Sequence, residues 1–524
     1  MKKRKTLTLC LSLVLGAALM LTGCGGSTPE SGSGDQSGNA SQAVEAKDVV
    51  VAFGAEPLTF DPQDANDSIS NQANVLLYDK LVTFDENSRI VPQLATEWKT
   101  SEDGLKMTFT LREGVKFQDG TPFNAEAVKV NFDRVLNPEK KLARSSLYTD
   151  FIENVNVDSE YQVTFAFKKP FGAALNAFAH GAGGIISPKA IQDNADIGKN
   201  PVGTGPYKLK EWTPGTSVVF EPNQDFWGDK PKLKSITFKP VPENSSRTIM
   251  LENGEVDAIS PIASQDVDRL KQNSNIDVQI TPAYRNLYIA INASKPLFQD
   301  VKVRQALNYA VDKETIVNKI LNGQAKVADA AISESVTGYS SVGEYPFDPE
   351  KAKQLLAEAG VKPGTKIKLW TPDGRYLMDS KIAEFIQAGL QAVGFDVELR
   401  KWEWSAYQAE TDKKDSDFDL MVGSWGNSTG DADWGLRPLL TTNGANNYSR
   451  YSNPKVDELV EKGMSLSNLE ERTQTYHEAM QLIKDDAPWI FLVEYRQVQA
   501  HQKGLENVYT WANEYLILRD AVKK

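Results

Sequence analysis

Residues 365–400 read TKIKLWTPDGRYLMDSKIAEFIQAGLQAVGFDVELR, and this stretch decides the fold class. Its apolar residues predict a short strand at 367–369, a helix from Ile382 to Val393 and a second strand at 397–399. Gly394 directly follows the last apolar residue of the helical pattern, which is a common signal for a helix end. A strand, a helix and another strand in this order indicate an α/β fold.

The rest of the chain extends this pattern in both directions. Helical spacing is present at 303–311 and at 352–359, and further strands are predicted at 418–422 and at 49–53. Residues 84–201 differ, because alternating strands outnumber helices there. We therefore expect an α/β body that carries a separate, strand-richer insertion.

The N-terminus has the features of an export signal. Four basic residues at 2–5 precede an apolar run at 7–21, which is shorter than the roughly 17–25 residues of a membrane-spanning helix. Small residues lead into Cys24, a pattern that matches the lipobox of bacterial lipoproteins. We expect a signal peptide at 1–23, lipid attachment at Cys24, and a flexible tether over 24–47, where Gly, Ser, Gln and Asn dominate. An uncleaved helix with an incidental cysteine is the alternative.

Composition narrows the partners and the chemistry. The formal net charge is −12, and loss of the four basic signal residues would bring it to about −16, which argues against a nucleic-acid partner. Cys10 lies in the signal and Cys24 would carry lipid, so the mature body has no free thiol for a disulfide, a nucleophile or a metal site. We expect no cofactor.

Catalytic and metal-binding patterns are missing from the sequence. The segment HEAMQ at 477–481 lacks the second histidine of a zinc-protease helix, and no Gly-x-Ser-x-Gly elbow occurs. Asp431 and Asp433 are only two residues apart, so their spacing does not place two carboxyls on opposite sides of a glycosidic bond. We predict that the protein is not an enzyme and has no catalytic residues and no metal ligands.

Several motifs, in order along the chain, resemble one family. They are LATEW at 94–98, FTLREGVKF at 109–117, DGTPF at 119–123, GTGPY at 203–207, NQDFW at 223–227, GEVD at 254–257 and DVKVRQALNYAVD at 300–312. Together they resemble the peptide/nickel-type, family 5 extracytoplasmic solute-binding proteins of ABC importers, over Val49 to about Leu518. Taken alone, the turn motif at 203–206 is more typical of a structural crossover than of a phosphate-binding loop.

The resemblance implies a two-lobed, periplasmic-binding-protein-like fold of type II, with an extra inserted domain and a hinged ligand cleft. Transferred to this chain, it predicts three parts. The expected boundaries are 48–81, 203–284 and 494–524 for lobe I, 82–202 for the inserted domain, and 285–493 for lobe II.

The loop SWGNSTGDADW at 424–434 is the strongest candidate for ligand contact. It combines two tryptophans with two aspartates and several small polar side chains, which suits a buried polar ligand. With two upstream segments it gives the predicted ligand-binding set: Arg375, Tyr376, Trp404, Trp425, Asn427, Ser428, Thr429, Asp431, Asp433 and Trp434. The alternative is that Trp425 and Trp434 pack the lobe while Asp431 and Asp433 cap the next helix.

Family resemblance assigns roles to some of these residues. Arg375 falls near the arginine with which dipeptide binders hold a peptide carboxylate, and a guanidinium matches a carboxylate in a planar, bidentate way. Ser428 stands where those binders carry the aspartate that holds the amino group, so dipeptides become doubtful ligands unless Asp431 or Asp433 replaces it.

A second resemblance points to glutathione. The segments 373–376 and 425–439 look like the glutathione-binding branch of the family. Glutathione has two carboxylates and one amine. It would be complemented by Arg375, by a second basic group such as Arg437 or Arg285, and by an acidic group.

The expected function is that of the substrate-binding lipoprotein of an ABC importer. It would capture a small peptide, best glutathione, and deliver it to permease subunits that work with ATPases. We expect a monomer outside the cytoplasm, held by its lipid to the outer face of the cell membrane, on the periplasmic side where an outer membrane exists. A general oligopeptide, dipeptide or nickel-chelate binder is one alternative, and a non-transport adhesion or scaffold lipoprotein is another.

Overall fold

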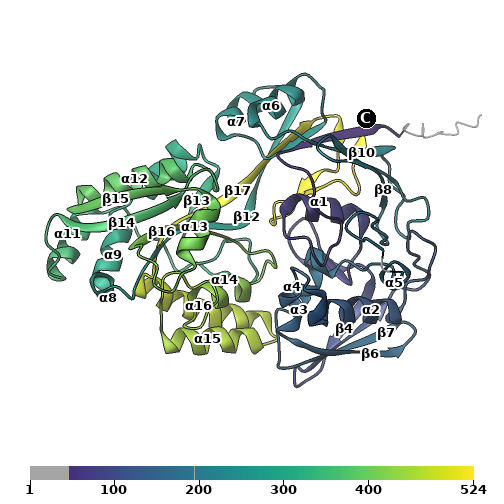
Figure 1. Ribbon diagram of the computed structural model, residues 1–524, viewed down its shortest axis with the longest axis horizontal. Helices are drawn as coiled ribbons and strands as arrows, with labels where there is room; N and C mark the ends of the chain where they lie inside the picture. The colour runs from purple at the N-terminus through teal and green to yellow at the C-terminus, as the bar shows by residue number, and fades with distance from the viewer. Residues whose placement is uncertain (1–45, 194) are drawn as a thin grey trace, which may run out of the picture. The chain divides into compact units, whose positions relative to one another are not determined.

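The computed structural model describes residues 46–193 and 195–524. The predicted signal peptide, Cys24 and the tether up to residue 45 lie outside this range. An 11-stranded mixed sheet runs through the described chain (Figure 1). Its strands, in spatial order, are β15 (Phe395–Trp402), β14 (Thr365–Pro372), β16 (Leu420–Gly426), β12 (Ile276–Ile291), β17 (Trp489–Gln502), β11 (Ala258–Ser260), β1 (Asp48–Phe53), β10 (Ser235–Pro240), β9 (Ser217–Pro222) and β8 (Tyr207–Thr213), with β13 (Ala325–Val327) beside β17.

Two long strands, β12 and β17, connect the two lobes of the fold. The first lobe is built around β11, β1, β10, β9 and β8, and the second around β14, β15 and β16. β12 and β17 pair along almost their whole length, with a register irregularity between Pro282 and Asn286. Figure 1 shows these two strands crossing from one lobe to the other. The lobe boundaries that we propose, 284/285 and 493/494, fall inside these strands.

The second lobe contains the strand–helix–strand unit expected from residues 365–400. β14 pairs in parallel with β15, and helix α12 (Asp379–Ala392) connects them. Gly394 has φ +110° after α12, in the left-handed region that glycine adopts without steric cost. The strand expected at 418–422 begins at Leu420 instead, where the pairing with β12 and β14 starts. Phe418 is buried in the core outside the strand, so its apolar character reflects burial and not sheet pairing.

A smaller sheet lies in the region expected to be an insertion. It has the order β4 (Ala95–Thr100), β5 (Lys106–Leu111), β7 (Gln162–Phe167) and β6 (Ile152–Ser159). Alternating residues such as Phe109 and Phe165 face one core with Phe132 and Phe178 from two helices. This sheet therefore has a hydrophobic core separate from those of the large sheet.

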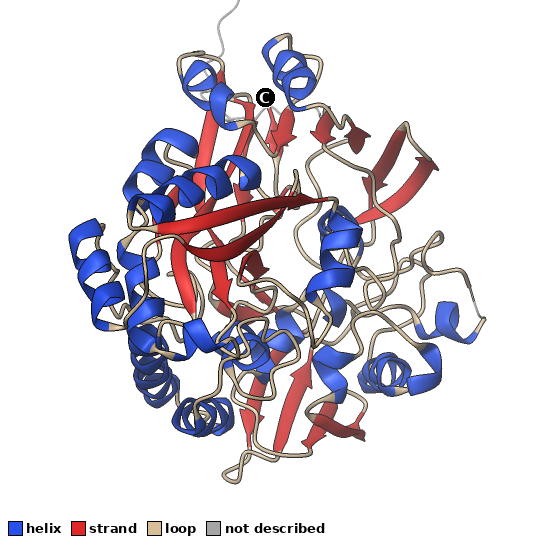
Figure 2. Cartoon of the chain, turned by 60° about the vertical axis from the view of Figure 1, so that its left-hand side comes forward, coloured by secondary structure: helices blue, strands red, loops and turns tan. Residues whose placement is uncertain are grey.

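Helices and short strands complete the described chain, and Figure 2 shows how they surround the sheets. The helices are α1 (Ser68–Leu77), α2 (Ala125–Leu136), α3 (Ser146–Thr149), α4 (Ala174–Ala179), α5 (Pro188–Gln192), α6 (Asn244–Glu252), α7 (Val267–Lys271), α8 (Pro296–Gln299), α9 (Val301–Tyr309), α10 (Lys313–Thr315), α11 (Pro349–Glu358), α13 (Trp404–Thr411), α14 (Ala432–Leu440), α15 (Pro454–Ser465) and α16 (Leu469–Asp486). The short strands pair as β2 (Val82–Phe84) with β3 (Ile90–Pro92), β18 (Leu505–Glu506) with β21 (Val522–Lys523), and β19 (Tyr509–Thr510) with β20 (Leu516–Ile517). None of the helices described here is long and apolar enough to cross a membrane.

The turn motif at 203–206 has the structural role that its composition suggested. A Cβ on Gly203 would lie 2.2 Å from the carbonyl oxygen of Leu77, so the backbone approach requires glycine. Thr204 donates a hydrogen bond from its hydroxyl to Asp79, 2.9 Å away. The motif fixes the chain against the C-terminal end of α1.

Candidate functional site

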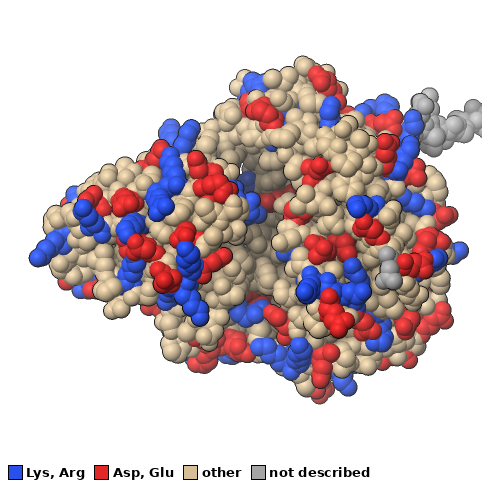
Figure 3. All heavy atoms as spheres, viewed as in Figure 1, with Lys and Arg blue, Asp and Glu red and all other residues tan. Residues whose placement is uncertain are grey.

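A cavity of about 730 Å³ lies between the two lobes, a size typical of small-molecule sites. In Figure 3 the surface is hollowed between the lobes, and charges of both signs are mixed across the face in view. The cavity is lined by segments that are far apart in the sequence. The first lobe and the small-sheet region contribute residues at 55–58, 66–71 and 144, β12 contributes residues at 284–288, the second lobe contributes residues at 375–376, 404–411, 421–428, 434 and 446–448, and the C-terminal segment contributes 512–515.

The structure brings seven of the ten predicted binding residues to this one cavity. They are Arg375, Tyr376, Trp404, Trp425, Asn427, Ser428 and Trp434. They come from the loop after β14, the start of α13, the end of β16, the loop that follows it and the first turn of α14. Because β14 pairs with both β15 and β16, the ends of these strands open toward the same space.

Arg375 enters the cavity from a loop that a single carboxylate organises. Asp379, at the start of α12, accepts hydrogen bonds from the backbone N–H groups of Arg375 and Tyr376 at 2.8 and 2.9 Å. The guanidinium of Arg375 lies 4.7 Å from the ring centroid of Trp404. It is exposed and forms no ion pair with any residue of the described chain. The indole ring holds the guanidinium in place, and its N–H groups can bind an anionic group of a ligand.

Aromatic side chains form much of the cavity wall. Tyr288 stacks on Trp489 with 3.8 Å between ring centroids, and Trp404 stacks on Tyr407 at 6.0 Å. The indole N–H of Trp425 donates to the backbone carbonyl of Trp434 at 2.9 Å, which holds the Trp425 ring against the backbone of α14. Flat apolar walls with few polar groups are typical of sites that bind small organic molecules.

Arg285 and Glu514 form an ion pair at the cavity wall. The Nε of Arg285 lies 2.8 Å from one carboxylate oxygen of Glu514, and its Nη2 lies 3.5 Å from the other. The Glu514 carboxylate raises the pKa of the Arg285 guanidinium above its ordinary value. Gly426 faces Arg285 across the β12–β16 ladder, and a Cβ there would lie 2.9 Å from Nη2. The missing side chain therefore leaves room for the guanidinium.

A second pair of charged groups lines the cavity on the side of the first lobe. Asp67 caps α1 by accepting the N–H of Ser70 at 2.8 Å, while its other oxygen is buried without a hydrogen-bond partner in the described chain. Arg144 donates from Nε to the carbonyl of Ala65 at 3.0 Å. Burial lowers the pKa of Arg144, and the nearby Asp67 opposes this shift.

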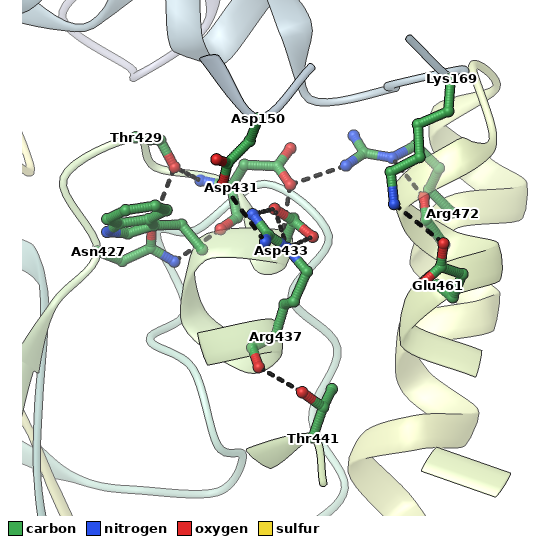
Figure 4. A network of polar contacts seen from close by, with 12 residues as sticks. Asp150, Lys169, Asn427, Thr429, Asp431, Asp433, Arg437, Thr441, Glu461 and Arg472 are labelled. Atoms are coloured by element: carbon green, nitrogen blue, oxygen red, sulfur yellow. Dashed lines mark hydrogen bonds and ion pairs between the residues drawn. The ribbon is translucent and has the colours of Figure 1, made fainter. Parts of the chain in front are cut away.

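Thr429, Asp431 and Asp433, the other three predicted residues, do not line the cavity. Figure 4 shows the polar contacts that they form instead. Asp431 is fully buried, caps α14 by accepting the N–H of Asp433, and forms a 2.7 Å ion pair with Arg472. Thr429 donates its hydroxyl to the side chain of Asn427 at 3.3 Å. The expected alternative, that Asp431 caps the next helix, is therefore what the structure shows.

Asp433 has the same kind of role. It is 2% exposed and pairs with Arg437, one helical turn later, at 3.0 Å. Burial raises the pKa of Asp433, and Arg437 opposes that shift. Arg437 also lies 3.8 Å from Asp150 of the small-sheet region (Figure 4). The suggestion of Arg437 as a second carboxylate-binding group needs correction, because it does not line the cavity and Arg285 does.

Sequence reasoning missed most of the first-lobe wall and Glu514. Arg285 and Glu514 are separated by more than 200 residues, and nothing in either local sequence indicates the contact. One signal was available for Glu514, because it follows Asn513 in a short polar turn between two strands. Side chains at such turns are commonly found at binding sites.

Two lobes joined by two long strands, with a cavity between them, define a two-lobed binding protein of the periplasmic type. Residues 89–447, more than half of the chain, match the family described as bacterial extracellular solute-binding proteins, family 5. The chain belongs to this family.

Individual relatives extend the comparison over nearly the whole chain. The glutathione-binding protein GsiB of Salmonella typhi is 37% identical over 472 residues, covering 88% of this chain and 92% of the relative. Among solved structures, HbpA2 from Haemophilus parasuis has a TM-score of 0.83 at 26% identity and covers 91% of this chain and 100% of its own. The dipeptide binding protein of Pseudoalteromonas sp. SM9913, in complex with Met-Leu, has a TM-score of 0.77 at 27% identity with the same coverage.

Proposed function

We propose that the protein binds a small peptide, with glutathione as the best candidate, in the cavity between its lobes and delivers it to an ABC permease. The observation that carries this proposal is Arg375, a guanidinium that has no ion-pair partner among the described residues and stacks on Trp404 at the wall of a 730 Å³ cavity. A guanidinium in that setting complements a peptide carboxylate by two parallel hydrogen bonds.

The charge pattern of the cavity supports glutathione within this class. Glutathione carries two carboxylates and one ammonium, and the cavity wall carries the cations Arg375, Arg285 and Arg144 together with carboxylates. Glutathione binding in the name of a relative with 37% identity supports the same choice.

General dipeptide or oligopeptide binding is the second candidate within the family. The structural likeness to a dipeptide binding protein supports it. The loop after β16 argues against ordinary dipeptides, because Ser428 stands where the resemblance places the amine-binding aspartate. The nearby Asp431 and Asp433 are already paired with Arg472 and Arg437. A nickel chelate is a further alternative that the same assay covers.

The test is thermal melting of the purified protein against a ligand panel. The panel contains reduced and oxidised glutathione, di- to pentapeptides, nickel with histidine, and simple sugars. A ligand that binds only the folded state raises the melting temperature, so a rise of several degrees with glutathione alone supports the proposal. Arg375→Ala is expected to reduce that rise.

Each other result of the panel selects an alternative. A rise with many peptides would make the protein a general peptide binder, and a rise with nickel and histidine alone would make it a chelate binder. No rise with any compound would contradict the proposal and favour an adhesion or scaffold lipoprotein, which has no need of a closing cleft.

We further propose that the mature protein begins at Cys24 and is held to the outer face of the membrane by lipid on that residue. The permease subunits and their ATPases would be its partners, and it would act as a monomer. Mass spectrometry of protein extracted from the native membrane tests the anchor. The expected N-terminal peptide starts at Cys24 with an added diacylglyceryl mass, and an intact residue 1 contradicts the proposal.

A further inference from the structure

Glu514 occupies a position that its backbone does not favour. It lies in the turn between β19 and β20, where Trp511 donates its N–H to the carbonyl of Tyr515, and its φ is +74°. Glycine and asparagine adopt this left-handed conformation readily, whereas a longer side chain is uncommon there. Residues kept in such conformations concentrate at binding sites, so the Glu514 side chain itself is of interest.

The ion pair with Arg285 leaves binding capacity on both partners. One Glu514 oxygen is held at 2.8 Å, but the other lies 3.5 Å from Nη2, near the limit of a hydrogen bond. The Nη1 of Arg285 has no hydrogen-bond partner in the described chain. Arg285 and Glu514 both line the cavity and are only partly buried. The pair therefore presents a free acceptor and a free donor side by side.

The cavity carries two other carboxylates, and both have structural duties. Glu56 accepts the backbone N–H of Gly215 at 2.8 Å, and Asp67 caps α1. The Arg285–Glu514 pair and Arg375 all line the cavity. Burial raises the pKa of the Tyr376 hydroxyl, and Arg375 and Arg285 both oppose this shift, so both guanidinium groups lie near Tyr376.

We infer that Glu514 and Arg285 together bind the α-amino acid head of the ligand, with Glu514 receiving the ammonium and Arg285 the α-carboxylate. Arg375 then holds the carboxylate at the other end of the peptide. This inference rests on the proposed function. It identifies the ligands of the cavity as small peptides in which one ammonium group and one carboxylate group are attached to the same carbon atom. The γ-glutamyl head of glutathione has that arrangement, whereas an ordinary peptide N-terminus carries an ammonium alone.

The test compares the binding of two ligands, one with a charged amino group and one whose amino group is acetylated, to two forms of the protein. Isothermal titration measures reduced glutathione and N-acetylglutathione against the unaltered protein and Glu514→Gln. Charge-assisted hydrogen bonds of this kind correspond to about tenfold to a hundredfold in affinity. We expect Glu514→Gln to lower the affinity for reduced glutathione by that factor. The affinity for N-acetylglutathione, which is already low, should remain almost unchanged.

A matched control separates local from general effects. Glu506→Gln removes a carboxylate of the same C-terminal segment that pairs with Lys524 at 2.6 Å and does not line the cavity. It should bind glutathione as the unaltered protein does. Equal weakening of both ligands by Glu514→Gln, or no weakening of either, overturns the inference while leaving the proposed function intact.

Failure of the proposed function gives a different pattern. If the unaltered protein binds ordinary peptides but not glutathione, the glutathione assignment fails, and the requirement for an α-amino acid head fails with it. If no amine-bearing compound binds, both proposals fail. The circular dichroism spectrum and melting temperature of Glu514→Gln establish that the variant is folded.

Discussion

Two clusters of arginines and carboxylates differ in their surroundings: Arg375, Arg285 and Glu514 line the cavity, and Asp431 and Arg472 lie behind its wall. In the cavity wall, Arg375 forms no ion pair within the part of the chain that the structure describes, and Arg285 is only partly buried beside Glu514. Behind the wall, Asp431 and Arg472 are 0% and 3% exposed and held at 2.7 Å. The same residue types thus serve two purposes, and burial separates them.

The physical reason is the cost of removing charge from water. A buried charge is tolerated only with a close partner, so Asp431 and Arg472 are bound to each other and cannot also serve a ligand. An exposed guanidinium remains hydrated at little cost, and it can exchange water for a carboxylate. For this loop, a binding role is therefore better inferred from incomplete pairing than from residue type.

Removing the buried carboxylate should have the largest effect. Asp431→Asn keeps a side-chain oxygen that can cap α14 but leaves the Arg472 charge uncompensated, which costs about 3–5 kcal/mol of the free energy of unfolding. Urea denaturation measures this loss. Glu458→Gln, which breaks the exposed pair with Lys455, is the control and should change stability by less than about 1 kcal/mol. Equal effects of the two changes would contradict the distinction between the clusters.

A buried carboxylate that forms no ion pair with any described residue should make stability depend on pH. Glu494 is 2% exposed, and its burial raises its pKa from 4.5 to about 7. The folded state then keeps a proton that the unfolded state releases, so stability falls as pH rises from about 4.5 to 7. The loss is about 3 kcal/mol and is complete above pH 7.

The measurement is the free energy of unfolding at pH 5 and pH 8. Glu494→Gln mimics the protonated form and should remove this part of the pH dependence, which makes the variant the more stable protein at pH 8. The other charged groups nearby, Lys326, Asp329 and Glu334, remain in both proteins. An unchanged pH dependence in the variant would show that Glu494 is ionised in the folded state.

Changing the exposed cation should separate affinity from stability. Arg375→Ala is expected to weaken glutathione binding by about tenfold to a hundredfold, the range of charge-assisted hydrogen bonds. Its free energy of unfolding should change by less than about 0.5 kcal/mol, as for surface substitutions in general. Titration calorimetry and urea denaturation measure the two quantities on the same preparation. A large loss of stability with unchanged affinity would show that Arg375 has a structural role, like Asp431 and Arg472, and does not bind the ligand.

The secondary structure near the site was predictable because it depends on local periodicity. The helix expected from Ile382 to Val393 is α12, Asp379–Ala392, and the position of Arg375 just before it placed that residue at the sheet edge. The pairing of Asp433 with Arg437 has helical spacing and was within reach of the same reasoning.

Contacts between distant segments were not predictable in this way. Asp431 meets Arg472, 41 residues later, through the packing of α14 near α16, and Glu514 meets Arg285 through the pairing around β12. No periodicity encodes these contacts. The sequence therefore singled out a loop that borders the cavity, but it could not separate the residues that line the cavity from those that support it.

The smallest expected effect concerns the contacts between the small-sheet region and the part of the second lobe that contains Asp431 and Arg472. Gly172 donates its N–H to the carbonyl of Met464 at 2.7 Å, and Asn176 donates to the carbonyl of Thr429 at 3.1 Å. A Cβ at Gly172 would lie 1.9 Å from the carbonyl oxygen of Leu466, so Gly172→Ala must push the two regions apart.

Because the cavity lies between the lobes, Gly172→Ala should weaken ligand binding by about tenfold or less, mainly through faster dissociation. Stopped-flow measurement of dissociation tests this expectation. Gly504→Ala is the control, since its added Cβ would meet its neighbour at an ordinary 3.7 Å. If Gly172→Ala binds and releases glutathione as the unaltered protein does, the contacts behind the cavity support the loop without influencing the closed, ligand-bound state.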